Sequence, residues 1–349
     1  MFLWRCIKIG EIMKYRYSYF FLFIFIFKAF TLYSQENVAS QISYHQEIYE
    51  LYPQTWKELP QIPSPFTSAN GIEIIVAFLK SKEYAIIPVT VENEPPNIQY
   101  GGTRIGKGRQ LFIDSADFPT LEEMGLHSEE ELDLTREITG IPVQDITEIG
   151  RPEKSSEIGF MAEDEDILAV LKGDNHLVRQ LELTHPQMAR PLFHIWNMIL
   201  KGYAFGNIRI WDNIDYILYN GCEVRFGEVF PTRGFQESIF NDEILGTFQI
   251  NFYRELNEYE EAFLKEKYFR LNEEQMNGFM KKLSHILTGE MEPYYVMRYG
   301  FYEGHTDYRV DPIAIAFIFG LKSIEEIENA FPGHLVDVLF QHFTEEEMR

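Results

Sequence analysis

Residues 293–320 read PYYVMRYGFYEGHTDYRVDPIAIAFIFG and decide the fold, because two apolar segments in them enclose a short charged run. The second segment, Pro312 to Phe319, has no polar face in either the helical or the strand period, so the element it forms must be buried on all sides. Asp311 before Pro312 is typical of an N-cap and first helical residue, and Gly320 of the residue that ends a helix. We therefore predict a short core helix.

The charged run between these segments, residues 303–311, is the strongest candidate site. It places Glu303, His305, Asp307, Arg309 and Asp311 at alternate positions, which would all point the same way in an extended chain. Glu303, His305 and Asp307 form a candidate catalytic set, because a carboxylate beside an imidazole suits acid–base chemistry. His305, Asp307 and Asp311 form a candidate divalent-cation site, since these are ligand types for zinc, manganese or calcium.

The same run also has a purely structural interpretation. Asp311 would act only as an N-cap, Arg309 would pair with Asp307 or Glu303, and His305 would be a surface turn residue. The two interpretations differ in geometry. A catalytic site requires the side chains to converge in the floor of a pocket, opposite a second cluster such as Arg190 or His185.

Other motifs in the chain offer weaker chemistry. Residues 101–108, GGTRIGKG, match a phosphate-binding loop until Gly108 replaces the required Ser or Thr, and a strand-like segment follows where a helix is needed. The four acids at 163–166 lack the spacing of a calcium loop and are typical of a helix N-terminus. Cys222 has no histidine that the sequence marks as its partner. We find no established catalytic motif.

The first 35 residues predict an export signal. Lys14 and Arg16 precede the apolar run YFFLFIFIF at 19–27, which is short for a membrane span and typical of a secretory signal, with cleavage near Ser34 or Gln35. Met13 is an alternative start. We therefore expect a periplasmic or extracellular protein, and the alternative is an uncleaved N-terminal membrane anchor.

Charge and composition restrict the partners. The formal net charge of −23 becomes −27 without residues 1–35, because five basic residues and one acidic residue are lost. Such a field repels phosphate backbones and anionic lipid, so we expect no nucleic-acid partner and no peripheral membrane role. We also expect no integral membrane domain after signal removal. Cys222 would be the remaining cysteine, which excludes an intrachain disulfide. A content of 45% hydrophobic and 15% aromatic residues predicts a folded, aromatic-rich body.

The fold class follows from turn and cap signals. Asn220-Gly221 predicts a type I′ hairpin between strands at 214–219 and 222–229, because both central residues of that turn need positive φ. Residues 246–253 alternate as a third strand. Cap signals and apolar periodicity predict helices at 164–172, at 174–181, from 185, at 258–268 and at 273–287. We predict an α+β fold, helix-rich with small antiparallel sheets.

We expect four segments along the chain. Residues 1–35 are the signal, 36–65 a polar, proline-rich lead-in, 66–150 a β-containing N-terminal part, and 151–349 a helix-rich C-terminal part with the hairpin. The last two segments are expected to form one continuous body.

Two functions remain open from the sequence. The first is an envelope or extracellular binding protein that meets a protein partner through an aromatic-rich surface. The second is a hydrolase, metal-assisted or acid–base, that acts on a small molecule and is centred on Glu303, His305 and Asp307. The cofactor is not specified by the sequence.

Overall fold

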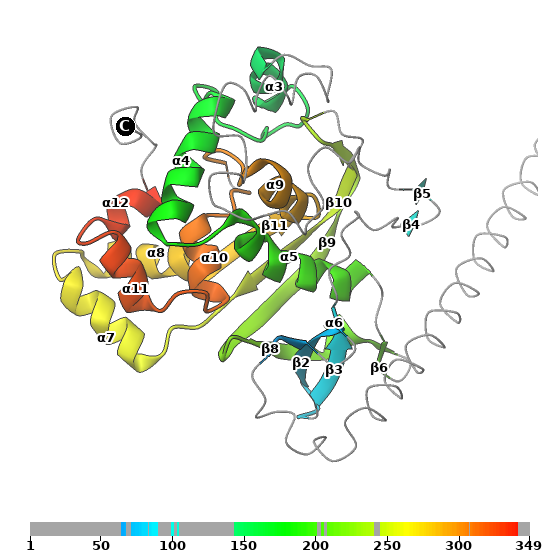
Figure 1. The fold of residues 1–349 in the computed structure, drawn as a ribbon, viewed down its shortest axis with the longest axis vertical. Coiled ribbons are helices and arrows are strands. Elements are labelled where there is room, and N and C mark those ends of the chain that lie inside the picture. The colour runs from blue at the N-terminus through cyan, green and yellow to red at the C-terminus, as the bar shows by residue number, and fades with distance from the viewer. Residues whose placement is uncertain are drawn as a thin grey trace, which may run out of the picture.

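The computed structural model describes residues 64–67, 71–82, 84–89, 99–100, 103–104, 143–200, 204–205, 208–240, 245–306 and 308–340. Within them the chain has the predicted α+β fold (Figure 1). The helices are α3 (Val143–Gly150), α4 (Ile167–Gln180), α5 (His185–Leu200), α6 (Ile210–Asn213), α7 (Glu258–Lys267), α8 (Glu273–Ser284), α9 (Glu292–Tyr299), α10 (Pro312–Ile318), α11 (Ile324–Ala330) and α12 (Leu335–Phe340). The strands are β1 (Phe66–Thr67), β2 (Glu73–Leu79), β3 (Tyr84–Pro88), β4 (Gln99–Tyr100), β5 (Thr103–Arg104), β6 (Ala204–Phe205), β7 (Ile208–Arg209), β8 (Ile214–Tyr219), β9 (Cys222–Glu237), β10 (Leu245–Tyr253) and β11 (His285–Gly289).

One antiparallel sheet organises the body. Its strand order is β1-β2-β8-β9-β10-β11, with β3 paired to β2, and Figure 1 shows helices α8, α10, α11 and α12 gathered beside the long strands β9 and β10. The predicted hairpin is confirmed, with φ of 47° at Asn220 and 81° at Gly221. The two-stranded pairs β4-β5 and β6-β7 are separate from it. No described helix is long and apolar enough to cross a membrane.

The C-terminal end of α8 differs from the prediction. We expected a helix over 273–287, but α8 ends at Ser284 and the chain continues as β11. Strand β11 pairs with β10 from Tyr253↔His285 to Gln249↔Gly289. The helix predicted from the apolar period is present over 273–284. Strand β11 was not predicted, because a strand forms there only by pairing with β10, which the local sequence does not reveal.

Helix α4 also differs from the prediction of two helices broken at Gly173. The helix is continuous and is capped by Asp166, whose carboxylate accepts two backbone hydrogen bonds in the first turn. Gly173 and Asp174 lie buried in its interior. Asp174 does not cap a helix because its carboxylate is bound by the Arg309 guanidinium, 135 positions along the chain.

The predicted core helix is confirmed as α10. All seven of its residues are buried, and Asp311 caps it by accepting a hydrogen bond from the Ile313 backbone N–H at 2.8 Å. Gly320 follows with φ of 58°, a left-handed conformation that suits glycine. Helix α10 contacts α8, α4, α5 and β11, so it lies where helices and sheet meet. Residues 300–304 and 310–311, which precede it, are buried as well.

Gly304 lets this loop pack tightly against the segment before α4. A Cβ on Gly304 would lie 2.1 Å from Glu165 Oε2 and 2.8 Å from Met161 Cα. The Gly304 N–H also donates to the Phe160 carbonyl at 2.7 Å. Only glycine fits this approach without a shift of neighbouring atoms.

We predict that Gly304→Ala lowers the free energy of unfolding by about 1–3 kcal/mol, because the added methyl group overpacks the contact with Glu165 and Met161. Gly278→Ala is the control, since Gly278 lies in α8 with nothing within 4 Å of an added Cβ. That change should stabilise the protein by up to about 1 kcal/mol. Equal effects of the two changes in urea denaturation would contradict the packing described for Gly304.

Candidate functional site

The buried guanidinium of Arg309 holds the described part of the loop 303–311 in place. Arg309 is 3% exposed at its side chain, and its Nη2 donates to Asp174 Oδ1 at 2.5 Å. Its Nη1 donates to the Glu303 carbonyl at 2.6 Å, and its Nε lies 3.7 Å from Asp311 Oδ2. The structural interpretation of the sequence expected Arg309 to pair with Asp307 or Glu303. Its described carboxylate partners are Asp174, on α4, and Asp311.

This buried group combines one guanidinium, that of Arg309, with the carboxyl groups of Asp174 and Asp311. Burial alone would lower the pKa of Arg309, but the two neighbouring carboxylates outweigh it and raise that pKa, so the guanidinium stays charged. Burial raises the pKa of Asp174 to about 6 against the attraction of Arg309, so Asp174 is still ionised at neutral pH. The Arg309 guanidinium is thus shared by the carboxyl groups of Asp174 and Asp311. The Asp174 charge in turn raises the pKa of Glu292, because like charges disfavour a second anion.

His305 is bound by Glu165. Its Nδ1 lies 2.5 Å from Glu165 Oε1, and its backbone N–H donates to Glu165 Oε2 at 2.9 Å. Burial would raise the pKa of Glu165, but the hydrogen bonds from His305 and from the Ala162 backbone outweigh it and lower that pKa. The ionised Glu165 thus ties the loop to the segment before α4. His305 is half-buried there, where the structural interpretation expected a surface turn residue.

Glu303 occupies a strained backbone position in the same loop. Its φ is +60°, an uncommon conformation for a residue with a side chain, and strained residues of this kind cluster at functional sites. The Arg309 hydrogen bond to the Glu303 carbonyl supports this conformation. The Glu303 side chain is buried and accepts a hydrogen bond from Thr306 Oγ1 at 3.1 Å.

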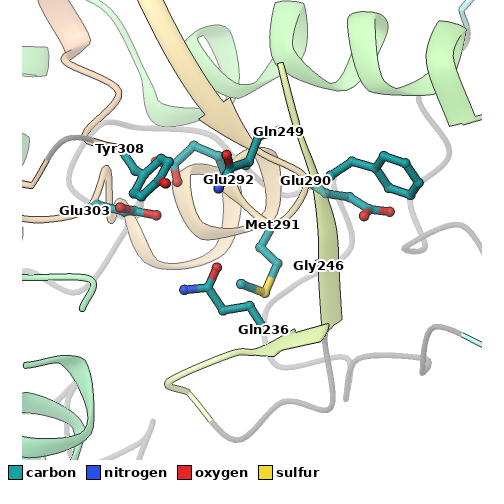
Figure 2. A pocket seen from close by; sticks show the side chains of 10 residues that line it. Gln236, Gly246, Gln249, Glu290, Met291, Glu292, Glu303 and Tyr308 are labelled. Atoms are coloured by element: carbon teal, nitrogen blue, oxygen red, sulfur yellow. The ribbon is translucent and has the colours of Figure 1, made fainter. Parts of the chain in front are cut away.

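Glu303 reaches a pocket between the sheet and the loop. The pocket is narrow, with a cavity volume of about 20 Å³, within about 400 Å³ of empty space that includes the open solvent at its mouth, and Figure 2 shows its lining. The lining residues come from the end of β9, from β10, from the β11–α9 junction and from the loop: Gln236, Gly246, Phe248, Gln249, Gly289, Glu290, Met291, Glu292, Glu303 and Tyr308. No lysine, arginine or histidine is among these described lining residues.

Glu292 is the second buried carboxyl group of this pocket. It is 1% exposed, and its Oε1 has no hydrogen-bond partner among the described residues. Figure 2 shows Glu292, Glu303 and Tyr308 grouped at one end of the pocket. Burial, then the Glu303 carboxyl and then Asp174 raise the pKa of Glu292 well above its usual range. Burial raises the pKa of Glu303 to about 8, although the Thr306 hydrogen bond and Arg309 oppose it.

The predicted site is therefore divided in two by the structure. Glu303 lines the pocket, whereas His305 binds Glu165 and Asp311 caps α10. Asp307 lies outside the described residues. Among the described residues, no group of three His, Cys, Asp or Glu side chains is arranged to hold a metal ion.

The second cluster suggested for the opposite side, His185 or Arg190, belongs to other contacts. His185 Nδ1 lies 2.9 Å from Tyr302 Oη, and Arg190 forms an ion pair with Glu73.

Glu292 was not among the predicted site residues. The signal available was a pair of acids, Glu290 and Glu292, between the apolar strand 285–289 and the aromatic run that follows Pro293.

Replacing Arg309 should unfold the site. We predict that Arg309→Met lowers the free energy of unfolding by about 3–5 kcal/mol, because Asp174 and Asp311 would be left buried without their counter-charge. Arg225→Met is the control, since Arg225 pairs with the more exposed Asp215 and Glu223 and should cost less than about 1 kcal/mol. Similar losses for both variants in denaturant titrations would argue against the buried group.

The carboxyl pair should also make stability depend on pH. The folded state keeps the Glu303 proton up to about pH 8, while the unfolded state loses it near the ordinary pKa of 4.5, so stability falls as pH rises between these values. Glu303→Gln removes this loss. The thermal midpoint of the variant relative to the parent should therefore increase from pH 5 to pH 8. The exposed Glu163→Gln is the control, and a difference that does not grow with pH would refute the prediction.

Comparison with known proteins gives no relative. No known protein family, no curated protein and no solved structure matches this chain. The interpretation of the pocket therefore rests on its own residues and their contacts.

Proposed function

We propose that the protein is an acid–base hydrolase in which Glu292 and Glu303 act together on a small polar substrate in this pocket. One observation carries the proposal: two buried carboxyl groups, from α9 and from the loop 303–311, share one end of a pocket. Buried carboxyl groups are costly to maintain unless they serve a purpose, and such groups are typical of catalytic clefts.

The two carboxyl groups have different surroundings, which suits different roles. Glu303 accepts a hydrogen bond from Thr306 and lies near the Arg309 charge, and both favour its anion. Glu292 has one oxygen without such a donor and lies beside Glu303. We assign Glu303 as the general base and Glu292 as the general acid, because environments that separate two pKa values divide the two roles.

The reaction balances with water as the second reactant. The Glu303 carboxylate takes a proton from water as its oxygen bonds to the electrophilic carbon of the substrate. The bond from that carbon to the leaving group breaks, and Glu292 gives its proton to the leaving atom. His305 is a positioning residue in this scheme, since its contacts with Glu165 hold the loop that carries Glu303.

A binding protein with an aromatic surface, the other function expected from the sequence, has less support. The largest fully buried side chains are all aromatic and include Tyr295, Tyr299 and Tyr302. Among the described residues the exposed large apolar side chains are Ile158, Tyr259, Phe269 and Phe340. The aromatic content thus serves the described core, and the carboxyl pair favours the hydrolase.

Hydrolysis can be tested above pH 8, where Glu303 is ionised, with p-nitrophenyl esters, p-nitrophenyl glycosides and amino-acid p-nitroanilides. We expect release of the chromophore by the parent and a loss of about 10²- to 10⁴-fold in kcat/KM for Glu292→Gln and for Glu303→Gln, because each variant lacks one proton-transfer group. Glu163→Gln should keep full activity, as Glu163 is exposed and outside the pocket. Absence of turnover across the panel, or activity unchanged in both variants, would reject the proposal.

A further inference from the structure

The residues that line the pocket indicate which charge its ligand carries. Its described lining offers no cationic side chain, so a phosphate or carboxylate group would enter without a counter-charge. Three glutamates line the pocket, and Glu292 and Glu303 share one end of it with Tyr308. Anionic ligands are thereby disfavoured.

Glu292 requires that the ligand donate a hydrogen bond. Glu292 lines the pocket, and its Oε1 is buried and has no hydrogen-bond partner among the described residues. An unsatisfied buried acceptor costs about 1–3 kcal/mol, and a ligand that donates a hydrogen bond to it recovers that cost. The ligand group that fits is therefore a donor, either a neutral one such as a hydroxyl or a charged one.

The surrounding charges distinguish the two kinds of donor. The groups that face Glu292 are Glu303 on the loop, Asp174 on α4 and Arg309, and the single guanidinium of Arg309 is shared between Asp174 and Asp311. A cation entering this end meets an attractive field that a neutral hydroxyl does not feel. The Tyr308 ring at the same end offers a further favourable contact for a cation.

We infer that the pocket binds the ammonium or guanidinium group of an organic cation, with Glu292 as the acceptor. The inference rests on the proposed function in naming the substrate class of that same site. It also completes the chemistry of the pair. When both carboxyl groups are neutral no base is present. A positive charge beside them favours loss of one proton, and Glu303 loses it because Thr306 and Arg309 favour its anion. Glu292 then keeps its proton as the acid and accepts from the cation through Oε1.

Methylguanidinium is a suitable probe, and methylurea is its neutral analogue of nearly the same shape. In calorimetric titrations at pH 7 we expect methylguanidinium to bind at least about tenfold more tightly than methylurea, as a charged donor gains more from a buried acceptor. Titrations in two buffers of different ionisation enthalpy should report release of about one proton. Between pH 6 and pH 7.5 the binding constant should rise roughly tenfold per pH unit.

Two variants distinguish binding in this pocket from non-specific binding of cations to an acidic protein. Glu292→Gln should weaken methylguanidinium binding at least about tenfold and reduce the proton release, whereas Glu163→Gln should leave both unchanged. Thermal unfolding of each variant verifies that it is folded. Equal binding of methylurea, or full binding and proton release in Glu292→Gln, would overturn the inference.

The two proposals fail in different ways. Methylguanidinium is not hydrolysed, so its binding is measured without turnover. If the cation binds as described but the chromogenic panel shows no turnover, the ligand class stands and the hydrolase is rejected. If the neutral glycosides or esters are hydrolysed in a Glu292-dependent way and methylguanidinium does not bind, the hydrolase stands and the cationic substrate is rejected.

Discussion

The charge of Arg309 inside the protein is the interaction on which the rest of the described site depends. It joins Asp174 in the middle of α4, the cap of α10 at Asp311 and the carbonyl of Glu303. A buried guanidinium is tolerated when its donors and charge are both satisfied, and here both are supplied from segments far apart in sequence. The same contacts set the position of the loop that carries Glu303.

The electrostatics of the pocket depend on burial and on that arrangement. Burial is the largest cause of the raised pKa of both Glu292 and Glu303. The Glu303 carboxyl and Asp174 raise the pKa of Glu292 further, whereas Thr306 and Arg309 oppose the shift at Glu303. Holding two carboxyl groups neutral costs stability at physiological pH, a trade that proteins accept mainly where function requires it.

Features determined by local chemistry were predicted well from the sequence. The Asn220-Gly221 turn and the Asp311-Pro312 helix start each need only a few adjacent residues, and both are confirmed.

Features determined by distant partners were not predicted. Gly173-Asp174 resembled a helix boundary, and only the contact with Arg309 explains why the helix continues. In the candidate site, Glu303, one of the predicted site residues, lines the pocket. Glu292 was not predicted, because its place in the pocket depends on a loop that folds back beside it. His305 was predicted as a site residue from its residue type alone. Its partner Glu165 could not be predicted, because it lies 140 positions away in the sequence.

The topology of the sheet has a consequence for the nascent chain. Strand β2 pairs with β8, as in Val76↔Leu218, so residues 142 positions apart must meet before the sheet is complete. Every residue of β2 except Phe78 is buried in the finished fold, and contacts over such separations form slowly. A growing polypeptide therefore displays the apolar β2–β3 ribbon until the ribosome has added β8. During that interval a holding chaperone would protect it from aggregation.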